Sequence, residues 1–519
     1  MFGTELSYSQ LVDQVERLAG ALVSLGVRRE DRVLLCMQNC TQVVVAHFAI
    51  LRADAVVVPV NPMSKSEELR HYIGDSGAKV GIVTADLATG LASASDLLDA
   101  TERLQCLVVT QYTDGFDAER HDEEAPIPTW RDWLCKAHEL PTSGCTVVTW
   151  ADALQSNRPP QVHAARGDDM AMLPYTSGTT GHPKGCIHHH SSVNHNAFAS
   201  QHWALLSPET VMLAAVPLFH ITGIVMMHAA VVAAGTLVIM PRWNRELAGR
   251  LISRRKVSYW SCIPTMVVDL LASPDFASFD LSSLVHIGGG GTAMPQAVAQ
   301  RLLDTYGLRF VEGYGLTETA APSHANPWRR PKQQCLGMPF ISTDSRVIDP
   351  ETKKELPHGE AGEIVTHGPQ LFKGYWRQPE ATAAAFVEIE GKKFFRTGDL
   401  GRIDEDGYFF MTDRLKRMIN ASGFKVWPAE VETLLFRHPA VQEACIISTR
   451  DDYRGESVKA IVVLRSTHAH TTADQVVEWC RQNMAAYKVP RQVQFVEALP
   501  KSGSGKVLWR ALQEHEDGG

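Results

Sequence analysis

The feature that most constrains the fold is an alternation of helical patterns with short, largely apolar segments. Apolar residues recur at helical spacing from Leu11 to Leu25, and Gly26 stands where a glycine commonly ends a helix. Strands that are apolar on both faces must be covered on both faces, so the pattern predicts parallel sheets between layers of helices. The predicted strands are Arg32–Cys36, Val56–Val60, Val80–Thr84, 285–287 and 308–311, with helices over about Gln42–Arg52 and 295–306.

The texture of the sequence changes beyond Thr412, where short alternating stretches surround one amphipathic helix near Ala473–Asn483. About a hundred residues of this kind predict a small separate α+β domain. We therefore expect an α/β protein whose large N-terminal domain, residues 1–412, consists of packed mixed and parallel sheets with helices, followed by a small domain over residues 413–519. The segment Thr113–Asp169 is rich in Asp, Glu, Pro and Ser, and we expect it to be a surface connection within the large domain.

Composition narrows the partners and the compartment. The 519 residues carry a formal net charge of −8, which leaves no basic surplus for a nucleic-acid backbone and excludes nucleic acid as a partner. The ten cysteines are scattered, and only Cys36 and Cys40 approach metal-ligand spacing, which indicates reduced thiols. No signal peptide is indicated around Glu5, and His228 interrupts the apolar stretch from Gly223 to Met240, so we expect a buried helix and strand there rather than a transmembrane segment. These features predict a cytoplasmic protein.

The most informative motif is Tyr175-Thr-Ser-Gly-Thr-Thr-Gly-His-Pro-Lys184-Gly185. Its glycines and hydroxyl residues predict a loop that surrounds phosphate oxygens with N–H and O–H groups, while Lys184 adds a positive charge. It is not a Walker A loop, because only two residues separate Gly181 from Lys184. The C-terminal stretch Gly503-Ser-Gly-Lys506 fails the same test, and a polar turn would explain either stretch alone.

These two stretches are the first and the last of six motifs that occur in a fixed order along the chain. Together they resemble the adenylate-forming superfamily of acyl-CoA synthetases, luciferases and peptide-synthetase adenylation domains, with a similarity that runs from about Leu6 to Trp509. The resemblance implies ATP-dependent activation of a carboxylic acid, with ATP, Mg²⁺ and coenzyme A as cofactors and the small domain as a mobile lid. The motifs are Tyr175–Gly185, Gly313-Tyr-Gly-Leu-Thr-Glu-Thr319, Arg396-Thr-Gly-Asp399, Asp413-Arg414-x-Lys416, Ser422-Gly-Phe-Lys-Val-Trp-Pro-Ala-Glu-Val-Glu432 and Pro500-Lys-Ser-Gly-Ser-Gly-Lys506.

The resemblance also implies how ATP would be bound. Tyr314 would stack on adenine, Asp399 would accept both ribose hydroxyls, and Arg414 would support the ribose. Thr317 would bond the α-phosphate, and Glu318 would hold Mg²⁺, a hard cation that prefers carboxylate oxygen. The residues that would hold the β- and γ-phosphates are Thr176, Ser177, Gly178, Thr179, Thr180 and Lys184, and Gly289 and Gly313 are further expected cofactor-binding residues.

Two half-reactions follow from the same resemblance. Lys506 would lie between the substrate carboxylate and the α-phosphate, where it, Thr317 and Mg²⁺ would stabilise the charge that grows on the phosphoryl oxygens. For thioester formation the lid would rotate about Lys416 and exchange the Lys506 loop for the Ser422–Val426 loop. Gly423, which has no side chain, would let the pantetheine arm of CoA pass close to the backbone.

Three other sites have a structural as well as a functional interpretation. His220 resembles the family's gate at the carboxylate end of the acyl pocket and is expected to be catalytic, although a lone histidine is more often a satisfied core residue. The run from His188 to His190 is expected to be structural rather than a metal cluster, because no acidic or Cys partner is nearby in sequence. Cys262 is expected to line the pocket rather than act as a nucleophile, since no general base is indicated.

The expected walls of the acyl pocket are apolar or lack side chains, which leaves space and offers no countercharge. No Asp lies near His220 or in 285–292 to meet the ammonium of an amino acid. We therefore expect a fatty acid of medium or longer chain as substrate, with a bulky aryl acid as the alternative. The expected walls are Ile221, Gly223, Met227, Gly288–Gly291, Gly313, Ala320 and Ala321.

The leading prediction is an ATP-dependent acyl-CoA ligase whose partners are a carboxylic acid, ATP and CoA. A second hypothesis is an adenylation enzyme that passes the acyl group to a carrier protein or oxidises the adenylate. A third is a non-catalytic nucleotide-binding protein, and the presence of Lys506, Glu318 and Asp399 argues against it. A homodimer is left open.

The sequence departs from the family pattern in three places. Asp413 replaces a frequent Gly, and Arg417 stands where an acidic residue is common. The chain begins almost at its first helix, so a wall of the pocket or a dimer contact is expected to be missing.

Overall fold

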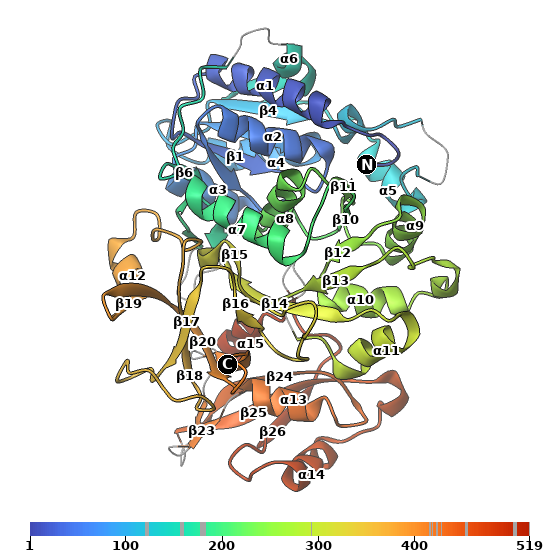
Figure 1. The fold of residues 1–519 in the computed structure, drawn as a ribbon, viewed down its shortest axis with the longest axis vertical. Helices are drawn as coiled ribbons and strands as arrows, with labels where there is room; N and C mark the ends of the chain where they lie inside the picture. The colour runs from blue at the N-terminus through green and yellow to red at the C-terminus, as the bar shows by residue number, and fades with distance from the viewer. Residues whose placement is uncertain are drawn as a thin grey trace. The chain divides into compact units, whose positions relative to one another are not determined.

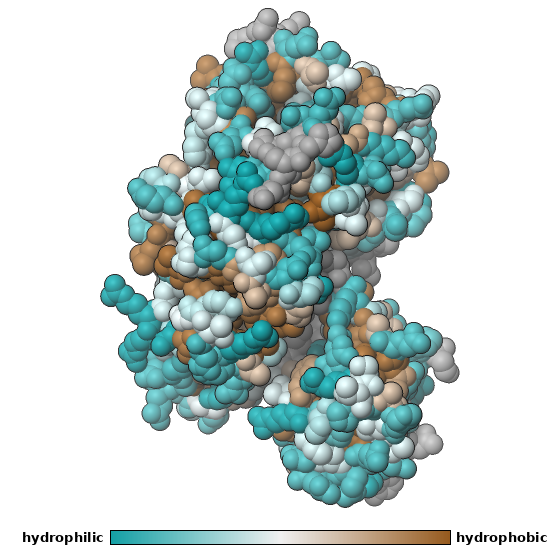
Figure 2. Space-filling model, turned by 90° about the vertical axis from the view of Figure 1, so that its right-hand side faces the viewer, coloured by the Kyte–Doolittle hydropathy of each residue, from teal (hydrophilic) through white to brown (hydrophobic). Residues whose placement is uncertain are grey.

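The structure is a computed structural model that describes residues 1–517 except 120–123, 156–159, 177–182, 292, 415–416, 418, 422–423, 427, 452–454 and 502–505. Its contacts divide the chain into two compact units, which we call unit 1 (Met1–Thr343 and Gly368–Phe386) and unit 2 (Asp344–His367 and Val387–Gly519). Hydrophilic residues make up most of the face shown in Figure 2, in keeping with a chain in which 21% of residues are charged. Within the described ranges, no helix combines the length and the apolar character that crossing a membrane requires.

The first sheet of unit 1 is built from the alternating segments of the sequence (Figure 1). Its order is β5 (Thr146–Thr149), β4 (Cys106–Thr110), β3 (Val80–Thr84), β1 (Arg32–Cys36), β2 (Val56–Pro59), β6 (Met170–Met172) and β9 (His188–His189). All neighbours pair in parallel except β6 and β9. The helices of this region are α1 (Tyr8–Ser24), α2 (Thr41–Arg52), α3 (Ser66–Ser76), α4 (Ala85–Asp96), α5 (Pro128–Leu134), α6 (Trp150–Gln155) and α7 (His190–Trp203).

Side chains alternate along these strands between two separate cores. Val33 and Leu35 of β1 pack in one cluster with residues of α1 and α2, whereas Leu34 and Cys36 pack in another with residues of α3 and α4. The predicted parallel sheet with helices on both faces is therefore confirmed. The predicted end of the first helix is confirmed as well, because α1 ends at Ser24 and Gly26 has φ +92°.

A second seven-stranded sheet completes unit 1. Its order is β11 (Thr236–Ile239), β10 (Val211–Ala214), β12 (Tyr259–Ser261), β13 (His286–Gly289), β14 (Phe310–Leu316), β15 (Ala321–Ala325) and β16 (Met338–Pro339). The sheet is parallel up to β14, and β15 and β16 are added antiparallel. The accompanying helices are α8 (Ile221–Val232), α9 (Arg245–Arg255), α10 (Pro264–Leu271) and α11 (Gln296–Tyr306), and unit 1 also contains α12 (Pro379–Ala384).

The two sheets share one core, in which α2 and α8 meet. His47 of α2 and His228 of α8 form a hydrogen bond of 2.7 Å between their Nε2 atoms, and both rings are buried. Burial lowers the pKa of His228 to about 4, so the pair is neutral at neutral pH. The stretch from Gly223 to Met240 thus forms a buried helix and a strand, as the sequence predicted.

The prediction that Thr113–Asp169 is only a surface connection is wrong in part. Within this segment β5 pairs in parallel with β4 at the edge of the first sheet, and Leu134 and Trp150 are buried in the large core. The strand was missed because β5 has four residues, none of them fully buried, and so has no wholly apolar pattern.

Unit 2 contains two further sheets. One has the order β17 (Asp344–Ile348), β18 (Gly362–His367), β20 (Lys392–Ile403) and β19 (Phe386–Ile389), with β21 (Phe409–Arg414) also paired to β20. The other has the order β23 (Phe424–Val426), β22 (Ile419–Ala421), β25 (Gly455–Leu464) and β24 (Val441–Asp451), with β26 (Gln492–Phe495) paired to β25. Its helices are α13 (Pro428–Leu435), α14 (Ala473–Asn483) and α15 (Trp509–Asp517).

The α+β character expected of the C-terminal segment is observed, including the helix predicted at Ala473–Asn483. The contacts group β17–β21 with the C-terminal sheet, whereas the sequence placed these strands before a boundary at residue 412. That boundary stays a prediction.

Candidate active site

The predicted phosphate loop joins two short strands of unit 1. Strands β7 (Tyr175–Thr176) and β8 (Lys184–Gly185) pair antiparallel, with Thr176 opposite Lys184. The hydroxyl of Tyr175 donates to Asp75 Oδ2 at 2.6 Å, which ties β7 to α3. The paired strands bring the two ends of the motif together, while the predicted phosphate ligands Ser177, Gly178, Thr179 and Thr180 lie outside the described residues.

Thr317 and Glu318 lie on a single turn of 3-10 helix, Thr317–Thr319, that follows β14. His188 of β9 donates from Nε2 to the Thr317 carbonyl at 2.7 Å, so this histidine is structural, as predicted. Asn196 of α7 donates from Nδ2 to the carbonyls of Thr319, Ala320 and Pro322 at 3.1, 2.7 and 3.0 Å. The turn is therefore held by two side chains, His188 and Asn196, that lie in one continuous segment of the chain, β9 and α7.

The backbone after this turn is in an unusual conformation. Ala320 and Ala321 have φ of +47° and +71°, in the left-handed region that residues with a Cβ seldom occupy. Such conformations persist only where surrounding bonds hold them, and they concentrate at functional sites. The three carbonyl contacts of Asn196 are bonds of that kind.

Tyr375 is a residue of this site that the sequence analysis missed. Its hydroxyl donates to Glu318 Oε1 at 2.8 Å, and Lys184 Nζ lies 5.1 Å from the centre of its ring. Tyr375 therefore contacts two of the predicted ATP-binding residues. Its position in the sequence, 57 residues beyond Glu318, gives no signal that could have revealed this.

Tyr314 and Gly313 lie on β14, and Gly289 ends β13 beside it. The ring of Tyr314 is buried and packs 5.6 Å from the ring of His324. Stacking of Tyr314 on adenine stays a prediction. The three residues lie on neighbouring strands of one sheet.

The glycines of the expected acyl-pocket wall have a different explanation from the one the sequence suggested. A Cβ at Gly289 would overlap the carbonyl oxygen of Cys262, and a Cβ at Gly290 would overlap that of Gly313. At Gly223 the obstacle would be the carbonyl of Pro217. These positions are glycine because backbones approach closely there, so their missing side chains are not evidence of room for a substrate.

His220 precedes α8 and is its N-cap, where its Nδ1 accepts from the N–H of Thr222 at 3.4 Å. The next residues of the helix include Ile221 and Met227, both buried. Cys262 is buried too, and burial raises the pKa of its thiol well above the usual value, so it stays protonated. This agrees with the prediction that Cys262 is not a nucleophile.

The remaining predicted site residues belong to unit 2. Asp399 is buried on β20, directly opposite Arg414 of β21 in the backbone register. Lys506 is exposed and directly precedes Val507, which forms an isolated bridge with Lys501. Lys416 and Gly423 lie outside the described residues.

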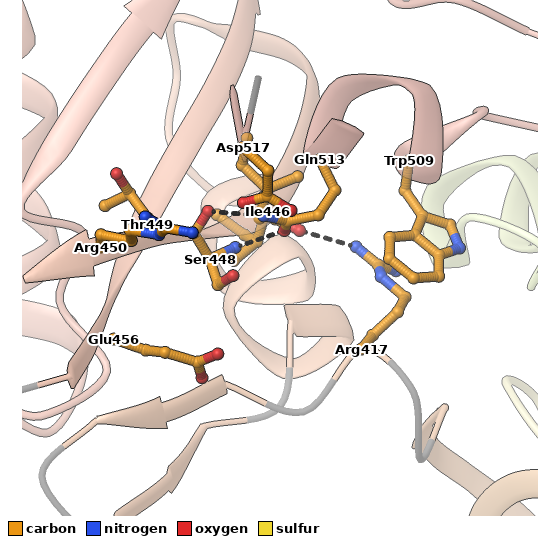
Figure 3. A pocket seen from close by; sticks show the side chains of 10 residues that line it. Arg417, Ile446, Ser448, Thr449, Arg450, Glu456, Trp509, Gln513 and Asp517 are labelled. Carbon is orange, nitrogen blue, oxygen red and sulfur yellow. Dashed lines mark hydrogen bonds between the residues drawn. The ribbon is translucent and has the colours of Figure 1, made fainter. Parts of the chain in front are cut away.

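Arg417, one of the two residues expected to depart from the family pattern, is held within unit 2 (Figure 3). Its guanidinium forms an ion pair with Glu432 of α13, donates to the Ile446 carbonyl of β24 at 3.0 Å and lies 5.5 Å from the ring of Trp509 of α15. Glu432 in turn accepts from the Ile446 N–H at 2.8 Å. The charge reversal at position 417 is thus matched by a carboxylate, beside a hollow of about 360 Å³ between β24 and α15.

The described residues contain no group of three or more His, Cys, Asp and Glu side chains arranged to bind a metal ion. Unit 1 instead brings the Lys184 ammonium and the Glu318 carboxylate against the same residue, Tyr375. Groups of these two kinds suit an enzyme that handles phosphate groups.

Comparison with known proteins gives the family. Residues 1–376 match the family model described as AMP-binding enzyme, and residues 430–506 match the AMP-binding enzyme C-terminal domain. The chain belongs to the AMP-binding enzyme family, the adenylate-forming superfamily that contains the acyl-CoA synthetases. It is an AMP-forming acid–CoA ligase that uses ATP and CoA.

Three relatives illustrate this similarity. The long-chain-fatty-acid–CoA ligase of Bacillus subtilis (strain 168) is 32% identical over 528 residues, which cover 99% of this chain and 91% of that protein. The feruloyl-CoA synthase of Amycolatopsis sp. is 34% identical over 510 residues, covering 98% and 93%. The crystal structure of ATP-bound MatB from Rhodopseudomonas palustris matches with a TM-score of 0.83 at 28% identity, covering 99% of this chain and 94% of that one.

We expect unit 1 to lose stability as the pH falls from about 6.5 to about 4, because His188 is neutral in the folded protein. Burial lowers its pKa from 6.5 to about 4, so the unfolded chain takes up a proton before the folded one does. Stability is therefore complete above this window and lost within it. At about pH 5 the loss from this group is roughly 2 kcal/mol.

Urea titrations at about pH 7 and about pH 5 measure this loss. The variant His188→Gln can still donate to the Thr317 carbonyl but cannot be charged, so its stability should fall by roughly 2 kcal/mol less than that of the wild type. An equal fall in the two proteins would contradict the assignment.

Proposed function

We propose that this ligase activates a fatty acid of medium or longer chain, first to an acyl-adenylate and then to the acyl-CoA thioester. The observation that supports the adenylation chemistry is the assembly around Glu318. Tyr375 donates to the Glu318 carboxylate, and its ring lies beside the ammonium of Lys184 from the predicted phosphate loop. The N–H of Phe372 donates to the Glu318 carbonyl, within the turn Thr317–Thr319. These are the groups that a triphosphate would require. The aryl acid stays the second candidate, because the feruloyl-CoA synthase of Amycolatopsis sp. is as similar as the fatty-acid ligase.

In adenylation, a carboxylate oxygen of the acid attacks the α-phosphorus of ATP, and the bond to pyrophosphate breaks. Charge grows on the phosphoryl oxygens during this step, and fixed donors stabilise it better than mobile water does. We assign this role to the Thr317 hydroxyl and the Lys506 ammonium. Lys184 and the hydroxyl groups of the phosphate loop hold the β- and γ-phosphates that leave.

Glu318 is the residue that would hold Mg²⁺. It is a buried carboxylate that accepts a hydrogen bond from the hydroxyl of Tyr375, and a hydroxyl donor orients a carboxylate without cancelling its charge. Mg²⁺ is commonly bound by one or two carboxylates together with substrate phosphates, so the donor fits. When bound, the ion would withdraw charge from the phosphate oxygens.

We expect Lys506→Ala to lower carboxylate-dependent ATP–pyrophosphate exchange by about a hundredfold or more, the usual effect of removing one transition-state donor. The matched control is Lys392→Ala, which removes another exposed lysine of unit 2 and should leave the exchange rate nearly unchanged. Exchange at the wild-type rate in Lys506→Ala would show that the assigned role is wrong.

In the second half-reaction the CoA thiol attacks the acyl carbon and AMP leaves. We propose that the small domain rotates about Lys416 between the two steps, bringing Gly423 and its loop to the pantetheine arm. Proline restricts φ, so Lys416→Pro should slow thioester formation by roughly tenfold or more while adenylation is largely kept. Lys416→Ala, which keeps φ free, is the control.

Single-turnover measurements separate the two steps. Acyl-adenylate formation is followed without CoA, and conversion of preformed adenylate is followed after CoA is added. If Lys416→Pro slowed both steps equally, the hinge role would be refuted.

The choice of acid rests on similarity and on the buried apolar residues Ile221 and Met227 of α8. It does not rest on Gly223, Gly289 and Gly290, because close backbone contacts explain those glycines. A panel of fatty acids from butyrate to stearate, with benzoate and ferulate, should give AMP and acyl-CoA fastest with a fatty acid of eight or more carbons. Preference for an aryl acid would favour the second candidate, and AMP formation that does not depend on CoA would favour transfer to a carrier protein.

The compartment also stays a proposal. All ten cysteines are free thiols, and eight of them have a raised pKa through burial, which suits a reducing compartment such as the cytoplasm.

A further inference from the structure

A short segment of unit 1, residues 372–376, runs beside the chain that leaves the phosphate loop. The N–H of Trp376 donates to the Gly185 carbonyl at 2.8 Å, and the N–H of Lys373 donates to the Ile187 carbonyl at 2.9 Å. Ile187 returns a bond of 3.0 Å to the carbonyl of Gly374. These backbone bonds fix the segment in register with Lys184 and the residues that follow it.

The same segment also holds Glu318 at two points. The N–H of Phe372 donates to the backbone carbonyl of Glu318, and the Tyr375 hydroxyl donates to its carboxylate, each at 2.8 Å. The backbone and the side chain of Glu318 are thus both tied to the segment that is paired with the phosphate-loop strand. A shift of one motif would have to move the other.

Tyr375 itself is held in place. Its N–H donates to Thr382 Oγ1 at 2.9 Å, and its ring packs edge-on against Phe372 with a centroid distance of 4.9 Å. Burial and the neighbouring Glu318 carboxylate raise the pKa of Tyr375, so its hydroxyl keeps its proton and acts as a donor. The ring faces the Lys184 ammonium at 5.1 Å, within the range of a cation–π contact.

We propose that Tyr375 is a positioning residue for adenylation, which aims the Glu318 carboxylate at the Mg²⁺ that accompanies ATP and holds it in register with Lys184. This inference rests on the proposed role of Glu318. A hydrogen bond from a hydroxyl fixes the orientation of a carboxylate and leaves its negative charge in place. A Lys or Arg at the same position would neutralise that charge. Tyrosine therefore orients the carboxylate and also keeps its charge, and no positively charged residue does both.

The test is Tyr375→Phe, which removes one oxygen and keeps the ring beside Lys184. ATP binding is measured by calorimetry with excess Mg²⁺ and again with EDTA. Loss of a hydrogen bond to a charged group is expected to weaken the Mg²⁺-dependent gain in ATP affinity by about tenfold, with little change in EDTA. The half-saturating Mg²⁺ concentration for pyrophosphate exchange should rise by a similar factor.

Tyr112→Phe is the matched control, because Tyr112 is a buried tyrosine of unit 1 whose hydroxyl lies 3.5 Å from Thr84 Oγ1, away from these motifs. It should bind ATP as the wild type does under both conditions. A second variant, Tyr375→Leu, also removes the ring and should weaken ATP binding in EDTA as well, because Lys184 loses its aromatic partner. Thermal unfolding of all three variants reports whether they fold.

The remaining outcomes separate this inference from the proposed function. An unchanged Mg²⁺ dependence in Tyr375→Phe, or an equal loss with Mg²⁺ and with EDTA, would overturn the positioning role. Glu318→Gln tests the underlying assignment: if it keeps the Mg²⁺-dependent gain, Glu318 is not the Mg²⁺ ligand, whatever Tyr375 does. If Glu318→Gln abolishes the gain and Tyr375→Phe reduces it, both stand.

Discussion

The candidate site of unit 1 depends on hydrogen bonds that side chains of β9 and α7 donate to backbone carbonyls of the turn after β14. His188 and Asn196 supply four such bonds. They hold Ala320 and Ala321 in left-handed conformations that each cost about 1 kcal/mol or more. Because β9 and α7 follow the phosphate-loop strands directly in sequence, one stretch of chain supplies the loop and also supports the turn that carries Thr317 and Glu318.

Close approach of backbones is the second constraint. The carbonyl oxygens of Cys262 and Gly313 occupy the places where side chains at Gly289 and Gly290 would lie. Glycine at these positions lets β13 and its neighbours come together at the carboxyl end of the sheet, where α/β enzymes bind their ligands. Read from the sequence alone, the same glycines suggested a wide pocket. A missing side chain has two possible causes, and only coordinates distinguish them.

Elements with a local sequence pattern could be predicted from the sequence, whereas contacts between residues far apart in the chain could not. The strands Arg32–Cys36 and Val80–Thr84 were predicted residue for residue, because burial on both faces leaves a local apolar signature. Strand β5 was missed because a short, partly exposed edge strand has none. The contact of Tyr375 with Glu318 could not be predicted, since it joins residues far apart in sequence and no polar motif marks Tyr375.

Charge explains why Lys184, Tyr375 and Glu318 belong together. The chain has a net charge of −8, so a triphosphate must be attracted by local groups rather than by the field of the whole protein. We propose Lys184 as such a group and Glu318 as the residue that would hold Mg²⁺. In that role a carboxylate beside the phosphates would favour the magnesium complex of ATP over free ATP, because the cation would lie between two negative groups. A neutral donor such as the Tyr375 hydroxyl preserves that distinction, because it orients Glu318 without cancelling the charge on which the distinction depends.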